Sequence, residues 1–125
     1  MRLLIDTQTF IWAVMGSSKL NRQARRIMLD ATAVFVSAAS IWEIAIKARL
    51  GKLDGDPGEF VAAIDQSGFR ELVIAARHAA MVHTLPQHHR DPFDRLLIAQ
   101  ALCEPLRLLT ADKMLGQYSE LVMTL

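Results

Sequence analysis

Short apolar runs alternate with longer segments in which apolar residues recur at helical spacing. Strands are predicted at 3–5, 34–37, 71–74, 106–109 and 121–125, the last at an edge. Helices are predicted at 9–15, 19–31, 40–50, 57–66, 75–85, 92–103 and 110–117. The run Val34-Phe35-Val36 is apolar throughout, as in strands buried on both faces of a parallel sheet. The alternation predicts an α/β fold whose central parallel sheet is covered by helices on both sides.

Length and composition predict one folded domain over residues 1–125. The chain is 52% hydrophobic and 22% charged, which excludes a disordered protein, and its formal net charge of +1 neither demands nor excludes a nucleic-acid partner. The lone Cys103 is expected in a reducing compartment. Asp6 and Gln8 interrupt the N-terminal apolar run, and no stretch reaches the length of a membrane helix. We expect a cytoplasmic protein that is not bound to a membrane.

Four acids are candidate functional residues because each is predicted at one edge of the sheet. Asp6 directly follows the first strand, and Asp112 follows the fourth. Glu43 and Asp94 are each predicted in the first turn of a helix that can point toward the same edge. Sites in open parallel sheets form at the carboxyl ends of the strands. The four carboxylates are therefore expected to share one pocket.

Helix capping is the alternative explanation for each acid taken alone. Ser40 and Glu43 have the spacing of a capping box, and Asp91 followed by Pro92 is typical of a helix start. Capping does not explain why Glu43 lies within the apolar segment 41–46, nor why apolar residues follow Asp94. These acids are expected at the rim of the core.

Carboxylates gathered at such a rim would repel one another unless a cation or protons neutralised them. Oxygen donors favour Mg²⁺ or Mn²⁺ over zinc, and Mg²⁺ in proteins commonly combines a few carboxylates with waters and a substrate phosphate. Hydrolysis of a phosphodiester bond is the reaction class that this pattern indicates.

Four segments of the chain resemble the PIN-domain family, specifically the VapC-type toxins of toxin–antitoxin pairs: 3–7, 36–47, 89–101 and 109–112. The resemblance implies a three-layer α/β/α fold with four to five parallel strands. It also implies an endoribonuclease that depends on Mg²⁺ or Mn²⁺ and is inhibited by an antitoxin. The family's acidic site falls on Asp6, Glu43, Asp94 and Asp112. Gln8 departs from the histidine often found at its position.

Several neighbouring residues are candidates for supporting or substrate-binding roles. Thr7 and Thr110 lie beside acids and can hydrogen-bond a carboxylate, or serve as ordinary turn hydroxyls. Arg95 is the preferred candidate for contact with an RNA phosphate, whereas Asp91 is expected to cap its helix. Leu- and Ile-rich helices also suggest apolar surface for a homodimer and for the antitoxin.

Other readings compete with the nuclease. His83, His88 and His89 suggest zinc, but they lack the spacing of a zinc site. A phospho-acceptor signalling domain has a similar sheet, yet no strand precedes Asp54 or Asp56. A PIN-like module that binds RNA or protein without cleaving is the remaining alternative. Trp42 and Phe93 are expected in the core rather than as surfaces that stack on bases.

Overall fold

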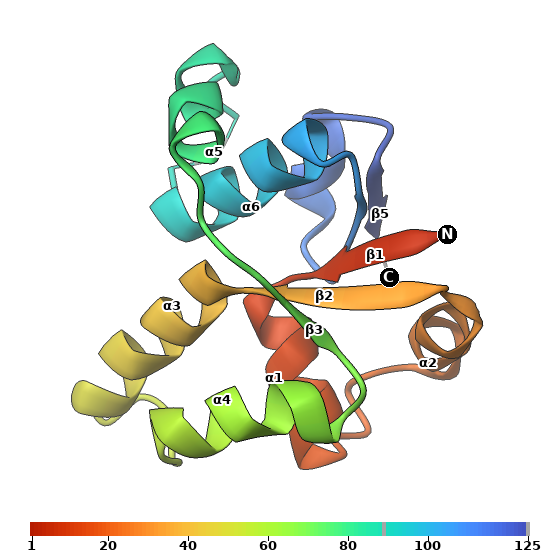
Figure 1. Cartoon of the computed structure of the whole chain (residues 1–125), viewed down its shortest axis with the longest axis vertical. Coiled ribbons are helices and arrows are strands. Elements are labelled where there is room, and N and C mark those ends of the chain that lie inside the picture. Colours follow the sequence, from red (N-terminus) through yellow and green to blue (C-terminus); the bar gives the residue numbers. More distant parts are fainter. Residues whose placement is uncertain (89, 125) are drawn as a thin grey trace.

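The computed structural model describes residues 1–88 and 90–124; His89 and Leu125, named in predictions above, lie outside the described residues. Five parallel strands form one sheet in the order β3-β2-β1-β4-β5 (Figure 1). The strands are β1 (Arg2–Ile5), β2 (Ala33–Ser37), β3 (Arg70–Leu72), β4 (Arg107–Thr110) and β5 (Val122–Thr124). The helices are α1 (Thr7–Met15), α2 (Arg22–Asp30), α3 (Ala38–Arg49), α4 (Pro57–Gln66), α5 (Ala76–Met81) and α6 (Pro92–Cys103), with 3-10 turns η1 (Val82–Thr84) and η2 (Lys113–Gln117).

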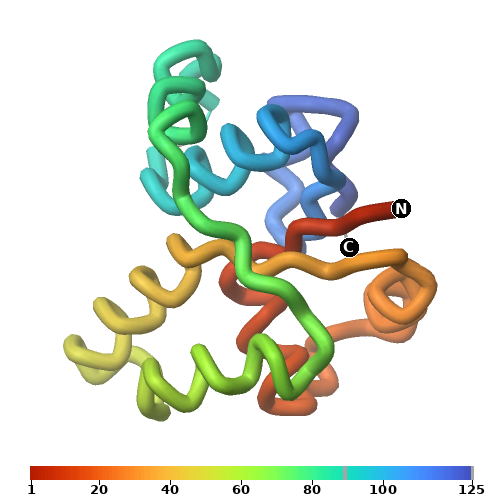
Figure 2. The backbone as a smooth tube through the Cα atoms, in the orientation of Figure 1, coloured from red at the N-terminus to blue at the C-terminus, as the bar shows by residue number. Residues whose placement is uncertain are grey.

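Helices cover the two faces of the sheet in separate layers, with α1, α2 and α4 on one side and α5 and α6 on the other (Figures 1 and 2). The alternation of side chains along β1 explains this division. Leu3 and Ile5 pack with α1, α2 and α4, whereas Leu4 packs with α6. The predicted α/β/α fold with a parallel sheet of four to five strands is confirmed.

The direction of strand addition reverses at β1. From β1 the chain adds β2 and then β3 on one side, and it later returns to add β4 and β5 on the other. Such a reversal leaves a crevice outside the carboxyl ends of the two central strands, here β1 and β4. The residues that follow these two strands are Asp6 and Ala111-Asp112.

Acidic and polar caps set the start of several helices. Asp6 caps α1, Ser37 caps α3, and Asp91 caps α6 with Pro92 at the first helical position. The predicted bounds of the long helix at 92–103 are those of α6. At the end of α1, Gly16 adopts a left-handed φ of 62° that favours glycine.

The start of α3 corrects the prediction for Glu43. Because Ser37 caps α3, the helix begins at Ala38, two residues before the predicted start at Ser40. Glu43 therefore lies in the second turn, not the first, and Ser40 is an interior residue rather than a cap. The capping-box explanation of Glu43 is wrong.

Smaller differences concern the ends of other elements. The third strand ends at Leu72, and Val73 and Ile74, predicted within it, are exposed. The predicted helix at 19–31 begins only at Arg22, because Asn21 supplies its cap. The segment at 75–85 divides into α5 and η1, and 110–117 contains only the turn η2. Within the described residues, no helix is long and apolar enough to cross a membrane.

Candidate functional site

An acidic pocket of about 340 Å³ lies at the carboxyl edge of the sheet. It is lined by Asp6, Thr7, Gln8, Glu43, Lys47, Asp91, Asp94, Ala111 and Asp112. The four predicted acids thus come from four separate segments of the chain to one cavity. Its position outside β1 and β4 is the crevice that the strand order creates.

Asp6 is a buried acid in the lining of the acidic pocket. Its Oδ1 accepts a hydrogen bond of 2.9 Å from the backbone N–H of Thr9, and its Oδ2 accepts one of 2.6 Å from the Thr110 hydroxyl. Burial raises the pKa of the Asp6 carboxyl above its ordinary value; the bonds from Thr110 and Thr9 oppose that increase, and the charge of Glu43 adds to it. Negative charge at Asp6 is therefore costly without a counter-charge.

The Thr110 hydroxyl connects two of the acids. It donates to Asp6 and accepts a bond of 3.0 Å from the backbone N–H of Asp112. The Asp112 carboxylate in turn accepts a bond of 2.9 Å from the backbone N–H of Met114, at the start of η2. One buried side chain thereby fixes the end of β4 relative to the end of β1.

Glu43 is a buried acid on an otherwise apolar stretch of α3. Only 8% of the residue is exposed, and its Oε2 lies 2.9 Å from the ammonium nitrogen of Lys47, one turn further along the helix. Its other oxygen, Oε1, is buried and has no hydrogen-bond partner among the residues that the structure describes. A buried carboxylate oxygen without a donor is energetically costly, so this atom is suited to bind a cation.

The two acids at the start of α6 differ in their surroundings. The Asp91 Oδ1 accepts the backbone N–H groups of Phe93 and Asp94, at 2.8 and 3.1 Å, which is the geometry of a helix cap. Asp94 lies in the first turn of α6, as predicted, is partly buried and lines the acidic pocket. Asp91 also lines it, so its capping role does not remove it from the site.

Thr7 is hydrogen-bonded to Ser40, a residue that was not predicted to belong to the site. Its hydroxyl donates a bond of 2.9 Å to the hydroxyl of Ser40, and both side chains are buried. This bond joins the start of α1 to α3, beside Glu43. Ser40 stands three residues before Glu43, a spacing that suggested a capping box. Residues three apart also lie on the same face of a helix, which is how the two are arranged in α3.

Arg95 does not line the acidic pocket. Its guanidinium donates to the backbone carbonyls of Pro86 and Val82 and to the hydroxyl of Tyr118, and 8% of the residue is exposed. The structure therefore does not bring Arg95, the preferred candidate for contact with an RNA phosphate, to the acidic pocket. Because successive helical residues point about 100° apart, Arg95 is turned away from the direction of Asp94, and it ties α6 to the preceding segment.

The donor set fits a hard divalent cation in its chemistry. All the acids offer oxygen, and the Oε1 atom of Glu43 lacks a partner. Over residues 1–88 and 90–124, however, no three His, Cys, Asp or Glu side chains are grouped closely enough to hold an ion as they stand. The carboxylates instead bind donors of the protein, as expected for like charges that repel one another.

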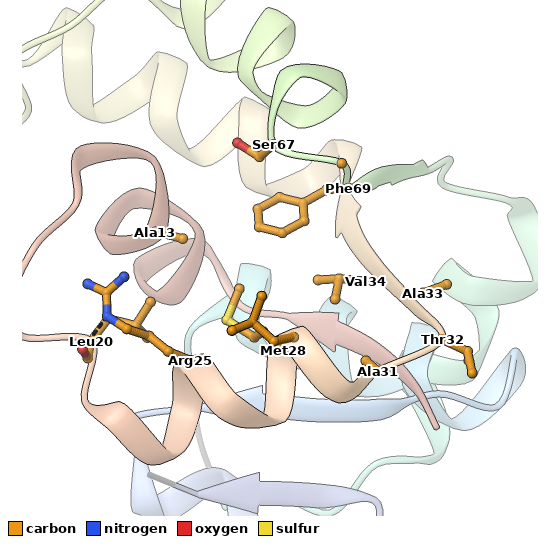
Figure 3. A pocket seen from close by; sticks show the side chains of 12 residues that line it. Ala13, Leu20, Arg25, Met28, Ala31, Thr32, Ala33, Val34, Ser67 and Phe69 are labelled. Atoms are coloured by element: carbon orange, nitrogen blue, oxygen red, sulfur yellow. Dashed lines mark hydrogen bonds between the residues drawn. The ribbon is translucent and has the colours of Figure 1, made fainter.

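A larger cavity of about 450 Å³ lies elsewhere, bounded by α1, α2, β2 and the start of the segment that leads to β3 (Figure 3). Its lining includes Leu20, Met28, Val34 and Phe69. Arg25 stands at its rim, with its guanidinium bonded to the carbonyls of Leu20 and Ser17. This apolar cavity contains none of the acids.

Residues 3–121 match the PIN domain family. No curated protein matches the sequence. Solved structures share the fold at low sequence identity. The VapBC2 complex of Rickettsia felis, bound to a promoter DNA fragment, gives a TM-score of 0.71 at 14% identity and covers 100% of this chain and 99% of that chain. A toxin–antitoxin complex of Klebsiella pneumoniae gives a TM-score of 0.68 at 19% identity, covering 98% of this chain and 96% of that chain. VapC20 of Mycobacterium tuberculosis, a toxin that cleaves the sarcin–ricin loop, gives a TM-score of 0.61 at 16% identity, covering 94% of this chain and 97% of that chain.

Proposed function

The chain belongs to the PIN-domain family, and we propose that it is a metal-dependent endoribonuclease, the toxin of a toxin–antitoxin pair that acts in the cytoplasm. The observation that carries this proposal is the convergence of Asp6, Glu43, Asp94 and Asp112, from four segments, on one pocket at the reversal of the sheet. A pocket lined by so many acids binds cations, not anions, and a phosphodiester can approach it only when the charge is neutralised.

Asp6, Glu43, Asp94 and Asp112 are the residues that would hold Mg²⁺ or Mn²⁺. A divalent cation held there would supply two kinds of chemistry, a lowered pKa for a water nucleophile and stabilisation of the charge that develops on the phosphate. Thr110 keeps the Asp6 and Asp112 segments in register through its two hydrogen bonds. Thr7 does the same for α1 and α3 through Ser40. The protein's contribution is thus the placement of carboxylates around a cavity closed by β1 and β4.

An antitoxin and a second copy of the chain are the proposed protein partners. Support for the antitoxin comes from the neighbouring folds, which were solved as toxin–antitoxin complexes in Rickettsia felis and Klebsiella pneumoniae. Support for a homodimer comes from α3, where Trp42, Ile46 and Leu50 form an exposed apolar stripe. Sedimentation velocity of the purified protein tests the dimer; a monomer at every concentration up to about 100 µM would overturn it, since a dimer weaker than that is not stably associated.

RNA cleavage by the purified, antitoxin-free protein tests the enzymatic proposal. Total RNA is incubated with Mg²⁺, with Mn²⁺ or with EDTA, and the Asp94→Asn variant serves as the control for contaminating nuclease. We expect discrete cuts that require the cation and disappear in the variant. Binding of RNA without any cut under the metal conditions would instead favour a non-cleaving PIN module.

A further inference from the structure

Among the described residues, Lys47 is the one basic residue that lines the acidic pocket. The lining otherwise contains five acids: Asp6, Glu43, Asp91, Asp94 and Asp112. The ammonium nitrogen of Lys47 lies 2.9 Å from the Oε2 atom of Glu43. The Lys47 ammonium group and a divalent cation in this pocket would therefore bind the same carboxylate, that of Glu43.

The pair differs from an ordinary ion pair on a helix surface. Exposed Glu–Lys pairs at this spacing are worth little because water screens both charges. Here the Glu43 side chain is 11% exposed, while that of Lys47 is 40% exposed. The Glu43 carboxylate is thus held within the protein, whereas the more exposed Lys47 side chain has room to move toward solvent.

The second oxygen of Glu43 indicates what the pair lacks. Its Oε1 atom is buried without a hydrogen-bond partner among the described residues. Lys47 thus neutralises the charge of Glu43 without satisfying the whole carboxylate. A divalent cation carries twice the charge and can bind either oxygen, so it has an advantage over the ammonium group at high enough concentration.

We propose that Lys47 is a positioning residue that competes with the divalent cation for Glu43 and so sets the cation concentration at which the site fills. In the metal-free protein its ammonium group offsets the repulsion among the buried acids. When the cation binds, Lys47 releases Glu43 and turns to solvent. This inference rests on the proposed function, because it assumes that the acidic pocket binds a divalent cation.

Mn²⁺ titration by calorimetry, without RNA and at fixed pH, tests the competition. Lys47→Met removes the charge and keeps the apolar stem of the side chain. Lys47→Arg keeps the charge. Lys52→Met is the matched control, because it removes the same charge from an exposed lysine that does not line the pocket. All four proteins are compared at equal ionic strength.

We expect Lys47→Met to bind Mn²⁺ about 3- to 10-fold more tightly than the wild type, equivalent to about 0.7–1.4 kcal/mol. Lys47→Arg should stay within about twofold of the wild type, and Lys52→Met likewise. Equal affinities for Lys47→Met and Lys52→Met would overturn the inference, leaving a helix ion pair. Weaker binding by Lys47→Met would also overturn it, because Lys47 would then assist the cation.

Thermal melts separate this inference from the proposed function and from simple loss of folding. Lys47→Met should lower the melting temperature in EDTA, and saturating Mn²⁺ should reduce that difference, as linkage requires for a tighter ligand. If the wild type itself gains no stability from Mn²⁺ and shows no binding heat, the proposed metal site fails. If the wild type binds and the lysine variants do not differ, only the role of Lys47 fails.

Discussion

The acidic pocket and the apolar cavity are two hollows of one small fold, and they differ in lining, in charge and in their place relative to the sheet. The apolar cavity is the larger, about 450 Å³ against about 340 Å³, and is lined by residues of α1, α2, β2 and the segments that connect helices and strands. The acidic pocket lies where the strand order reverses, and the partners of its carboxylates include the buried Thr110 hydroxyl, backbone N–H groups and the Lys47 ammonium group. Volume alone would select the apolar cavity, whereas charge that is costly to bury points to the acidic pocket, which we propose as the site.

This comparison makes opposite predictions for substitutions in the two regions. Loss of a carboxylate at the acidic pocket should reduce metal binding and cleavage while the fold stays intact. A change at the apolar cavity should reduce the free energy of unfolding while the chemistry persists.

The largest expected effect is that of Asp112→Asn on cleavage. Asparagine can still accept the N–H of Met114, so the start of η2 should persist, but the negative charge is lost. We expect cleavage to fall at least about 100-fold, beyond what loss of an outer partner costs. Asp91→Asn is the matched comparison, because it also preserves a cap. We expect Asp91→Asn to lose much less activity in the same rate assay; equal losses would contradict the distinction, because the charge of Asp91 would then matter as much as that of Asp112.

Thr110→Val removes the hydroxyl that connects Asp6 and Asp112 while preserving shape. We expect Mn²⁺ affinity to fall about 10- to 100-fold, the range for partners that orient metal ligands. Calorimetric titration measures the change. Thr124→Val, at an exposed position on β5, controls for the substitution itself and should be silent. An unchanged affinity in Thr110→Val would mean that the acids need no such orientation.

Val34→Ala tests the apolar cavity. Val34 is buried beneath α2 and borders a space that already lacks packing atoms, so truncation should cost about 2 kcal/mol of unfolding free energy. Urea denaturation measures that loss, and Mn²⁺ affinity should be unchanged. A large loss of affinity with little loss of stability would break the division between the two regions.

The smallest effect expected is a change in how stability depends on pH in Asp6→Asn. Burial raises the pKa of Asp6, so the folded protein holds a proton more tightly than the unfolded chain. In EDTA the wild type should therefore lose stability as the pH rises from the ordinary carboxyl range through the raised pKa of Asp6. The variant should lose less, and should be the more stable protein at neutral pH. A steeper loss in the variant, measured by melts across pH, would contradict this sign.

Much of this fold could be predicted from hydrophobic spacing because its strands are buried and its helices have clear caps and stops. The bounds of α6 follow from Asp91-Pro92 at one end and Pro105 beyond the other. The start of α3 could not be predicted, because Ser37 and Ser40 both have the chemistry of a cap and only tertiary packing decides between them. That choice determined whether Glu43 was a cap or a buried acid.

Side-chain direction was the other feature that sequence could not provide. Arg95 follows a site acid directly, yet successive helical residues point about 100° apart, so it turns to the loop carbonyls instead. Trp42, predicted in the core, is 60% exposed and contacts Phe93 edge-on. Both differences came from judging residues by their sequence neighbours rather than by the face of the helix.

The central claim is that Asp6, Glu43, Asp94 and Asp112 form one cation site, and Mn²⁺ binding measured by calorimetry tests it most directly. The wild type is compared with Asp6→Asn, Glu43→Gln, Asp94→Asn and Asp112→Asn, each first shown by circular dichroism to be folded. We predict that the wild type binds Mn²⁺ and that every one of the four variants binds it more weakly. Wild-type affinity in the folded variants would contradict the claim, because the acids would then share a cavity without sharing an ion.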